Sequence, residues 1–283
     1  MKNKSHLWYQ DSENHWVRSQ GFVDLSANDL IKRIAEQSHS KDIELKNKTY
    51  KERAWVFDLD STLFCLAPRI HNIFLEFVRA HPQPKAIWMQ LLNHLNPSIQ
   101  RYSIEETFCE LFAPWMGRDQ ARLEANSLWQ EFSPFWMEHF FEDRHIHYDV
   151  PYPGAQEFVS SVKKLNRKVI YLTGRDRLGS GQGTLAHLKK CGFEMSPDEV
   201  LVMKPSRHLD DVAFKESAAK LLKSQFDVEG LIDNEPENLM MFAKIFPEAE
   251  IILFHSVMSG RLPKENFQAA LGDRRALKIN SFR

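Results

Sequence analysis

The sequence is poor in the features that mark secreted, membrane and zinc-knuckle proteins. Its three cysteines lie far apart and show no CxxC spacing, so neither a disulfide framework nor a zinc knuckle is indicated. The start has no apolar stretch of signal-peptide length, and no segment approaches the roughly 20 apolar residues that span a bilayer. The formal net charge of −1 gives no global reason to bind a polyanion. We therefore expect a cytoplasmic protein with no membrane partner, and nucleic acid is disfavoured.

Glycine and proline are also few, at 11 and 13 residues. Because 43% of the residues are hydrophobic and 27% are charged, a largely disordered chain is excluded. The length of 283 residues suffices for one large domain, or for a domain with a smaller one inserted.

Strand and helix patterns alternate through the second half of the chain. The predicted strands are 168–172, 199–203, 229–232 and 250–254. Amphipathic helices separate them, with short connections. This alternation is typical of a doubly wound parallel α/β sheet with helices on both faces. The apolar run at 54–57 has the same character, so we assign it to this sheet as its first strand.

The segment between the first and second of these strands has no β character. It contains helical patterns punctuated by proline and rich in aromatic residues. We interpret these rings mainly as the core of a small helical bundle, with some of them lining a pocket. The predicted division is an N-terminal extension packing on the core at 1–50, an α/β core at 51–67 and 150–256, a helical cap domain at 68–149, and a C-terminal tail at 257–283.

Two further segments invite a functional interpretation that the sequence does not support. "LGSGQGT" (178–184) has three glycines but matches no nucleotide-binding pattern, so we predict a flexible entry to a helix that starts near Thr184. "HIHY" (145–148) offers two metal ligands on one face if it is a strand, but its place at the return from the cap disfavours a metal site.

Polar residues follow the predicted strands where each strand ends. These residues are Asp58 and Asp60 after the first strand, Thr173, Gly174 and Arg175 after the second, Lys204 and Lys215 after the third, and Asp233 and Asn234 after the fourth. In doubly wound sheets the ligand lies outside the carboxyl ends of the strands. We therefore expect these groups to converge at one edge of the sheet.

Two neighbouring carboxylates at that edge require a compensating charge. At about 5 Å and an effective dielectric of about 20, Asp58 and Asp60 would repel each other by roughly 3 kcal/mol, and Asp233 would add to this. A hard divalent cation such as Mg²⁺ resolves the conflict, since it prefers oxygen ligands and substrate phosphate. No His or Cys lies within these motifs, which disfavours zinc. The Thr173 hydroxyl, the Gly174 amide and a lysine suit the oxygens of a phosphate.

These residues resemble the four signature motifs of the haloacid dehalogenase-like (HAD) phosphatase superfamily. The matching residues are Asp58-Leu59-Asp60-Ser61-Thr62, Thr173-Gly174-Arg175, Lys215 and Ile232-Asp233-Asn234. The helical insertion resembles the cap that some members carry between the first and second motifs. The likeness covers residues 54–254.

The resemblance implies a Mg²⁺-dependent phosphomonoester hydrolase that works through an aspartyl-phosphate on a small phosphorylated metabolite. Asp58 would be the nucleophile, and Asp60 would act as general acid and then as base. The Asp58 carboxylate, the Asp60 backbone carbonyl and Asp233 would hold Mg²⁺. The implied phosphate-binding residues are Thr173, Gly174 and Lys215, with Arg175 as a supporting residue.

The chain departs from the family pattern at two places. Asn234 stands where many members have a second Asp, so that Asn234 or Glu237 could orient a metal-bound water. Lys204 competes with Lys215 for the lysine role, the alternative being a solvated loop residue. We prefer Lys215 because "DDVAFK" resembles the lysine motif of polynucleotide 3′-phosphatase modules.

Two alternatives stay open. The lysine-motif likeness suggests a phosphatase that trims nucleic-acid ends, but the near-neutral charge and the cap argue against it. A non-catalytic HAD-fold binding protein would be expected to have lost Asp58, Asp60 or Lys215, and all three are present. The sequence indicates neither the identity of the substrate nor an oligomeric state.

Overall fold

The computed structural model describes residues 15–44, 51–95, 101–193, 195, 200–259, 263 and 266–283. Its main sheet is built from β1 (Val23–Asp24), β2 (Glu52–Phe57), β5 (Lys168–Asp176), β6 (Val200–Lys204), β7 (Phe226–Asp233), β8 (Glu250–Phe254) and β9 (Leu277–Ile279). The strand order is β1-β9-β8-β7-β2-β5-β6, and every neighbouring pair is parallel. The predicted fold class, a doubly wound parallel α/β sheet, is confirmed.

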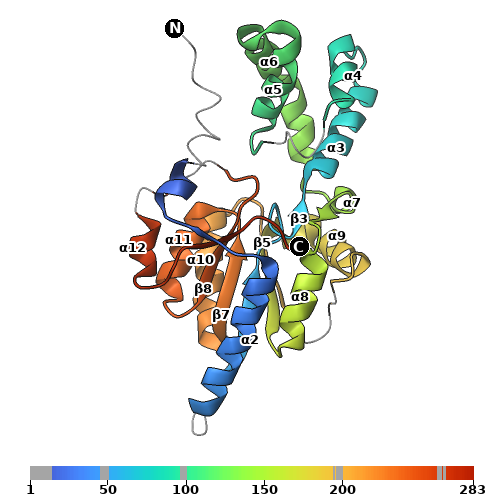
Figure 1. Cartoon of the computed structure of the whole chain (residues 1–283). Coiled ribbons are helices and arrows are strands. Elements are labelled where there is room, and N and C mark those ends of the chain that lie inside the picture. Colours follow the sequence, from blue (N-terminus) through green and yellow to red (C-terminus); the bar gives the residue numbers. More distant parts are fainter. Residues whose placement is uncertain are drawn as a thin grey trace.

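Helices cover both faces of this sheet, because its strands are apolar on both sides (Figure 1). The helices are α2 (Ala27–Glu44), α8 (Ala155–Lys164), α9 (Arg177–Lys190), α10 (Asp211–Gln225), α11 (Pro236–Ile245) and α12 (Phe267–Leu271). Along β2, Trp55 and Phe57 belong to the apolar cluster that includes α2 and α8. Ala54 and Val56 belong to the cluster that includes α10 and α11. This alternation fixes which way each strand residue points.

Two strands of the main sheet were not predicted. β9 lies in the segment described above as a C-terminal tail, and β1 lies in the N-terminal extension. β9 pairs with β8 through Phe254 and Ile279, and β1 pairs with β9 through Val23 and Leu277. Segments of two or three residues are too short to show a strand pattern. The edge of β8 selects β9, and β9 in turn offers the edge for β1.

Most of the inserted helices stand apart from the sheet, at the top of Figure 1, and the last of them lies beside α9. They are α3 (Ala67–Ala80), α4 (Ala86–Leu92), α5 (Ile104–Met116), α6 (Arg118–His139) and α7 (Asp143–Ile146). An antiparallel pair, β3 (Phe64–Cys65) and β4 (Val150–Pro151), joins them to the core. Several of the predicted bundle rings, such as Trp88, Phe108 and Phe132, are fully buried. The "HIHY" segment is not a strand, because α7 and the turn after it occupy these residues.

The glycine-rich segment is helical, so its interpretation as a flexible entry was wrong. α9 begins at Arg177, where the Asp176 side chain accepts a hydrogen bond from the Gly179 amide at 2.7 Å. Close packing explains Gly179 and Gly183. A Cβ at Gly183 would lie 2.6 Å from the backbone oxygen of Asp143, at the start of α7. Glycine here allows the return from the cap to lie directly against α9.

This packing leads to an expected difference between two alanine substitutions in one helix. Gly183→Ala should lower the free energy of unfolding by about 1–3 kcal/mol, because its Cβ would displace the backbone of Asp143. Gly181→Ala is the matched control. Its Cβ would meet nothing closer than 3.7 Å, so better helix propensity should raise stability by up to about 1 kcal/mol. Urea unfolding followed by circular dichroism measures both. Equal stabilities of the two variants would contradict the close contact.

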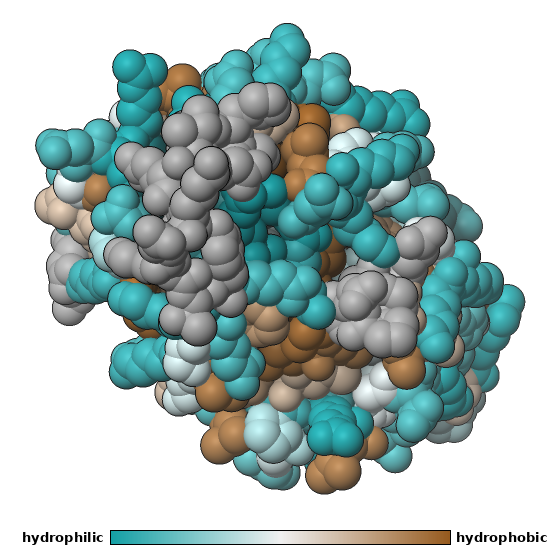
Figure 2. Space-filling view, turned by 90° about the horizontal axis from the view of Figure 1, so that it is seen from below, coloured by the Kyte–Doolittle hydropathy of each residue, from teal (hydrophilic) through white to brown (hydrophobic). Residues whose placement is uncertain are grey.

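The outer surface is predominantly polar on the face that Figure 2 presents. Hydrophilic residues cover most of this view, and hydrophobic ones gather in an area below its centre. Within the part of the chain that the structure describes, no helix combines the length and the apolar character needed to cross a membrane.

Candidate active site

The sheet order brings the motif-bearing segments together. β7, β2, β5 and β6 are neighbours, so residues at their carboxyl ends share one edge although they are far apart in sequence. The Asp58 amide extends the pairing of β2 with β7 by donating to the Ile232 carbonyl at 3.0 Å. The chain then turns through Ser61, whose φ of 59° lies in the left-handed region. This turn leaves Asp58 and Asp60 at the sheet edge, as predicted.

Lys215 lies between two of the predicted metal ligands. Its Nζ donates hydrogen bonds to Asp58 Oδ1 at 2.7 Å and to Asp233 Oδ2 at 2.8 Å. All three side chains are buried. One ammonium compensates the charge of only one carboxylate, so a further positive charge is needed when Asp58 and Asp233 are both ionised.

Burial and charge act in opposite directions on this group. Burial raises the pKa of Asp58 to about 7; Asp233 and Asp60 add to this effect, and Lys215 opposes it. Burial lowers the pKa of Lys215, but the carboxylates of Asp233 and Asp58 outweigh it and raise that pKa above the ordinary value. Lys215 is therefore protonated, whereas full ionisation of Asp58 at neutral pH needs a further positive charge.

Side-chain hydrogen bonds fix both carboxylates. The Thr62 hydroxyl donates to Asp58 Oδ2 at 3.0 Å, and Asn238 Nδ2 donates to Asp233 Oδ2 at 3.0 Å. Asn238 was missed in the sequence, because an amide on the helix after Asp233 carries no pattern of its own. Asn234 Nδ2 donates to the Val257 carbonyl at 2.5 Å, and its Oδ1 lies 3.2 Å from the Thr62 hydroxyl. Asn234 therefore ties the two motif loops together.

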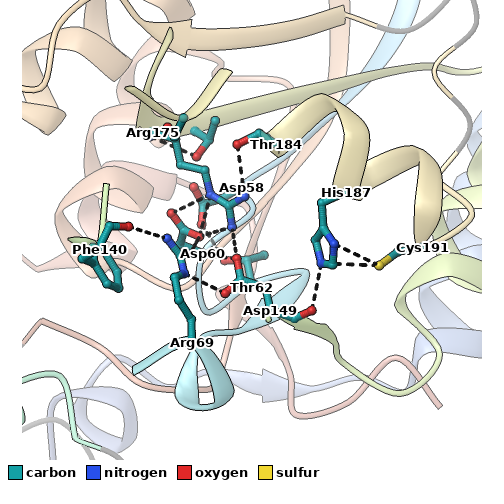
Figure 3. A network of polar contacts seen from close by, with 12 residues as sticks. Asp58, Asp60, Thr62, Arg69, Phe140, Asp149, Arg175, Thr184, His187 and Cys191 are labelled. Atoms are coloured by element: carbon teal, nitrogen blue, oxygen red, sulfur yellow. Dashed lines mark hydrogen bonds and ion pairs between the residues drawn. The ribbon is translucent and has the colours of Figure 1, made fainter. Parts of the chain in front are cut away.

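Asp60 is held by arginines (Figure 3). Arg175 donates to Asp60 Oδ1 from Nε at 2.9 Å and from Nη2 at 2.5 Å, and Arg69 Nη2 lies 3.4 Å from the same oxygen. Burial raises the pKa of Asp60, but the charges of Arg175 and Arg69 outweigh it, so that its pKa lies below the ordinary value. In this arrangement Asp60 is a carboxylate and not a proton donor.

The carboxylate of Asp149 joins the two arginines. It accepts from Arg69 Nε and Nη2 and from Arg175 Nη2, each at 2.8 Å, and all three residues are buried. Arg69 lies on the first cap helix and Asp149 on the return from the cap, whereas Arg175 and Asp60 belong to the core. This four-residue network, with two guanidiniums and two carboxylates, therefore links the cap to the site. Nothing in the sequence pairs Arg69 with Asp149.

A cavity of about 480 Å³ lies above these side chains. The predicted site residues that line it are Asp58, Asp60, Gly174, Arg175, Lys204, Lys215, Asn234 and Glu237. Thr173 is fully buried and is not among the described lining residues; its hydroxyl accepts from the Arg175 amide at 3.2 Å. Lys204 is not a solvated loop residue, because it is buried at the end of β6 and pairs with Asp211. Lys215, and not Lys204, contacts Asp58.

The network continues to His187 on α9 (Figure 3). His187 is buried, and its Nε2 lies 2.8 Å from the backbone oxygen of Asp149, which accepts its proton. Burial lowers the pKa of His187 below its ordinary value of 6.5. His187 therefore binds a proton less readily in the folded protein than in the unfolded chain. The free energy of unfolding should fall as pH drops below about 6.5, because protonation favours the unfolded chain.

His187→Gln keeps a donor for the Asp149 carbonyl but does not titrate. We expect the wild type to lose more unfolding free energy than His187→Gln between pH 7 and pH 5, by up to about 1.4 kcal/mol for each pH unit below 6.5. Urea unfolding at each pH measures the difference, and the same substitution at the exposed His147 is the control. Parallel pH profiles of His187→Gln and the wild type would contradict this role.

No protein-family model and no curated protein matches this chain. Solved structures do match it. A haloacid dehalogenase-like hydrolase from Streptococcus pneumoniae is 13% identical, with 81% of this chain and 94% of that chain covered and a TM-score of 0.42. A protein assigned as a phosphatase from Clostridium difficile is 12% identical, with 83% and 96% covered and a TM-score of 0.46. With identities below 25% and TM-scores below 0.5, this likeness says nothing of activity or substrate.

The donor set at the sheet edge fits a hard divalent cation. Asp58 and Asp233 share one ammonium, so a divalent cation would supply the positive charge that ionisation of both carboxylates requires. The described residues include no cluster of three or more His, Cys, Asp and Glu side chains arranged for a metal. The Asp60 side chain is turned to Arg175, so that only its backbone carbonyl could join the carboxylates of Asp58 and Asp233 in the implied ligand set.

Proposed function

We propose that this chain is a Mg²⁺-dependent phosphatase of the HAD-like superfamily that hydrolyses a small phosphomonoester through an aspartyl-phosphate. The observation that carries the proposal is the shared ammonium of Lys215, between Asp58 and Asp233, at the floor of a cavity lined by the cap. Two carboxylates, a lysine and the backbone amide of Gly174 at one sheet edge would provide a nucleophile and a place for phosphate oxygens.

Asp58 is the proposed nucleophile. Lys215 binds Asp58 Oδ1 and Thr62 binds Oδ2, so that the carboxylate is oriented before substrate arrives. When a phosphate lies above Asp58, Lys215 and the Gly174 amide would contact its oxygens, because both residues line the cavity. Thr173 would have to turn its hydroxyl toward the cavity to make its predicted contact.

Mg²⁺ would be held by the carboxylates of Asp58 and Asp233 and by the backbone carbonyl of Asp60. When bound, it would neutralise charge on the phosphate and keep Asp58 ionised. The ammonium of Lys215 would likewise neutralise charge on the phosphate and favour the ionised form of Asp58.

Asp60 is proposed to exchange a proton during the reaction. Its ion pair with Arg175 favours the carboxylate, which suits a base that accepts a proton from the hydrolytic water. Donation to a leaving oxygen would require Asp60 to separate from Arg175 and to take up a proton first, because the ion pair holds it as a carboxylate. Both groups line the cavity, so a bound substrate can come between them.

Phosphate release tests the proposal directly. Purified protein is assayed with acetyl phosphate, glycerol phosphate, sugar phosphates, nucleotides and a 3′-phosphorylated oligonucleotide, each with Mg²⁺ and with excess EDTA. We expect release with Mg²⁺, loss of release with EDTA and recovery when Mg²⁺ is restored. Absence of release from every compound would favour the non-catalytic alternative. Release confined to 3′-phosphorylated oligonucleotides would favour the nucleic-acid-end phosphatase. The cytoplasmic location stays a prediction.

A further inference from the structure

The cavity above Asp58 has a wall of aromatic side chains on its cap side. Trp136, Phe140 and Phe141, at the end of α6 and just after it, all line the cavity. The rings of Trp136 and Phe140 stack with their centroids 4.5 Å apart. Phe141 meets both rings edge-on, at 6.1 Å from Trp136 and 5.2 Å from Phe140. We call these three residues the aromatic wall. Because each ring packs on the other two, the wall is a preformed apolar surface.

The aromatic wall is fixed relative to the carboxylates. The Arg69 guanidinium lies over the Phe140 ring at 4.4 Å from its centroid, and Arg69 Nη1 donates to the Phe140 carbonyl at 3.1 Å (Figure 3). The same guanidinium binds Asp149 and lies beside Asp60. One arginine therefore contacts both the wall and the network that holds Asp60.

Further apolar residues accompany the wall in the lining of the cavity. Leu66, Ile70 and Ile104 line the cavity as well. The two guanidiniums of the network face two carboxylates, so neither arginine supplies an uncompensated charge for a second anionic group of the substrate. On the cap side of the cavity, the organic part of a substrate would thus meet an apolar and partly aromatic surface. The charged lining residues Arg207, Asp210 and Asp211 belong to the core, at the connection from β6 to α10.

We propose that the organic part of the substrate is an uncharged planar ring, either a nucleobase or a simple aryl group, that packs on the aromatic wall while the phosphate lies at Asp58. The proposal rests on the proposed phosphatase function. A planar ring gains stacking contact on such a wall. The many hydroxyls of a sugar phosphate would lose water there without finding partners. A cavity of about 480 Å³ lies within the range of about 300–1,000 Å³ that holds ligands of this size.

Matched pairs of esters test the ring without changing the phosphate ester. Uridine 5′-monophosphate and ribose 5-phosphate are both primary alkyl esters and differ in the base. Benzyl phosphate and ethyl phosphate form the second pair, which separates a simple aryl ring from a nucleobase. We expect kcat/KM to be at least tenfold higher for the ring-bearing member of at least one pair, and the pair that shows it identifies the source of the ring.

Substitution of the wall supplies the second measurement. Trp136→Leu and, as an independent variant, Phe141→Leu should each lower the ratio of kcat/KM within the responding pair at least fivefold. Trp115→Leu is the matched control, because Trp115 lies on cap helix α5, is 40% exposed and is not among the described lining residues. It should leave the ratio unchanged. Circular dichroism checks that each variant is folded. If one of the two wall variants does not fold, the other is used in its place.

Failure of this inference differs from failure of the proposed function. Hydrolysis of both members of each pair with ratios within threefold overturns the ring proposal and leaves the phosphatase standing. Ratios that respond to Trp115→Leu as strongly as to Trp136→Leu also overturn it. Absence of hydrolysis of any ester, with or without a ring, overturns the phosphatase itself.

Discussion

Asp58→Asn is expected to lower kcat by at least about four orders of magnitude on every hydrolysed ester, because the amide cannot attack phosphorus to form the aspartyl-phosphate. The variant should stay folded. Asn is nearly the same size as Asp, and it still accepts a hydrogen bond from Lys215 or Thr62. Burial beside Asp233 raises the pKa of the Asp58 carboxyl, so loss of its charge should not reduce the melting temperature.

Two measurements check this expectation. Phosphate release under saturating substrate gives kcat, and a thermal melt of the same preparation gives stability. Asp29→Asn, on the first turn of α2 and away from the described cavity lining, is the matched control and should keep wild-type turnover. Turnover by Asp58→Asn within tenfold of the wild type would exclude Asp58 as the nucleophile. An unfolded variant would show that Asp58 serves the structure.

Asp149→Ala is expected to lower the free energy of unfolding by about 3–5 kcal/mol. The substitution removes the partner of two buried guanidiniums, which make three hydrogen bonds of 2.8 Å to this carboxylate. Arg69 and Arg175 would then share Asp60 alone, which leaves an uncompensated buried positive charge. Because these residues come from the cap and the core, the loss should also displace the cap relative to the site.

Urea unfolding of Asp149→Ala measures the loss, with Asp24→Ala as the matched control. Asp24 pairs with Lys278, but its side chain is 64% exposed, so its removal should cost less than about 1 kcal/mol. Turnover should also fall, since Arg175 would be free to reorient Asp60. Equal costs of the two substitutions would show that the buried network contributes no more than a surface ion pair.

The alternation of apolar strands and amphipathic helices was sufficient to predict the fold class. β2 and β5 were found because apolar runs end at polar residues such as Asp58 and Thr173. β1 and β9 were not found, because two or three residues carry no periodicity and pair only with an edge that is already formed. The glycines of α9 were interpreted as flexibility, because the sequence does not show that Asp143 packs against Gly183.

The sequence alone determined which residues stand at the carboxyl ends of the strands. Each strand end is a local property, and a parallel sheet brings such ends together whatever their separation along the chain. Only the tertiary structure decided the partners of these residues. It paired Lys215 with Asp58 and Asp233, and turned Asp60 toward Arg175. Contacts between side chains distant in sequence depend on packing in three dimensions, and no pattern along the chain records that packing.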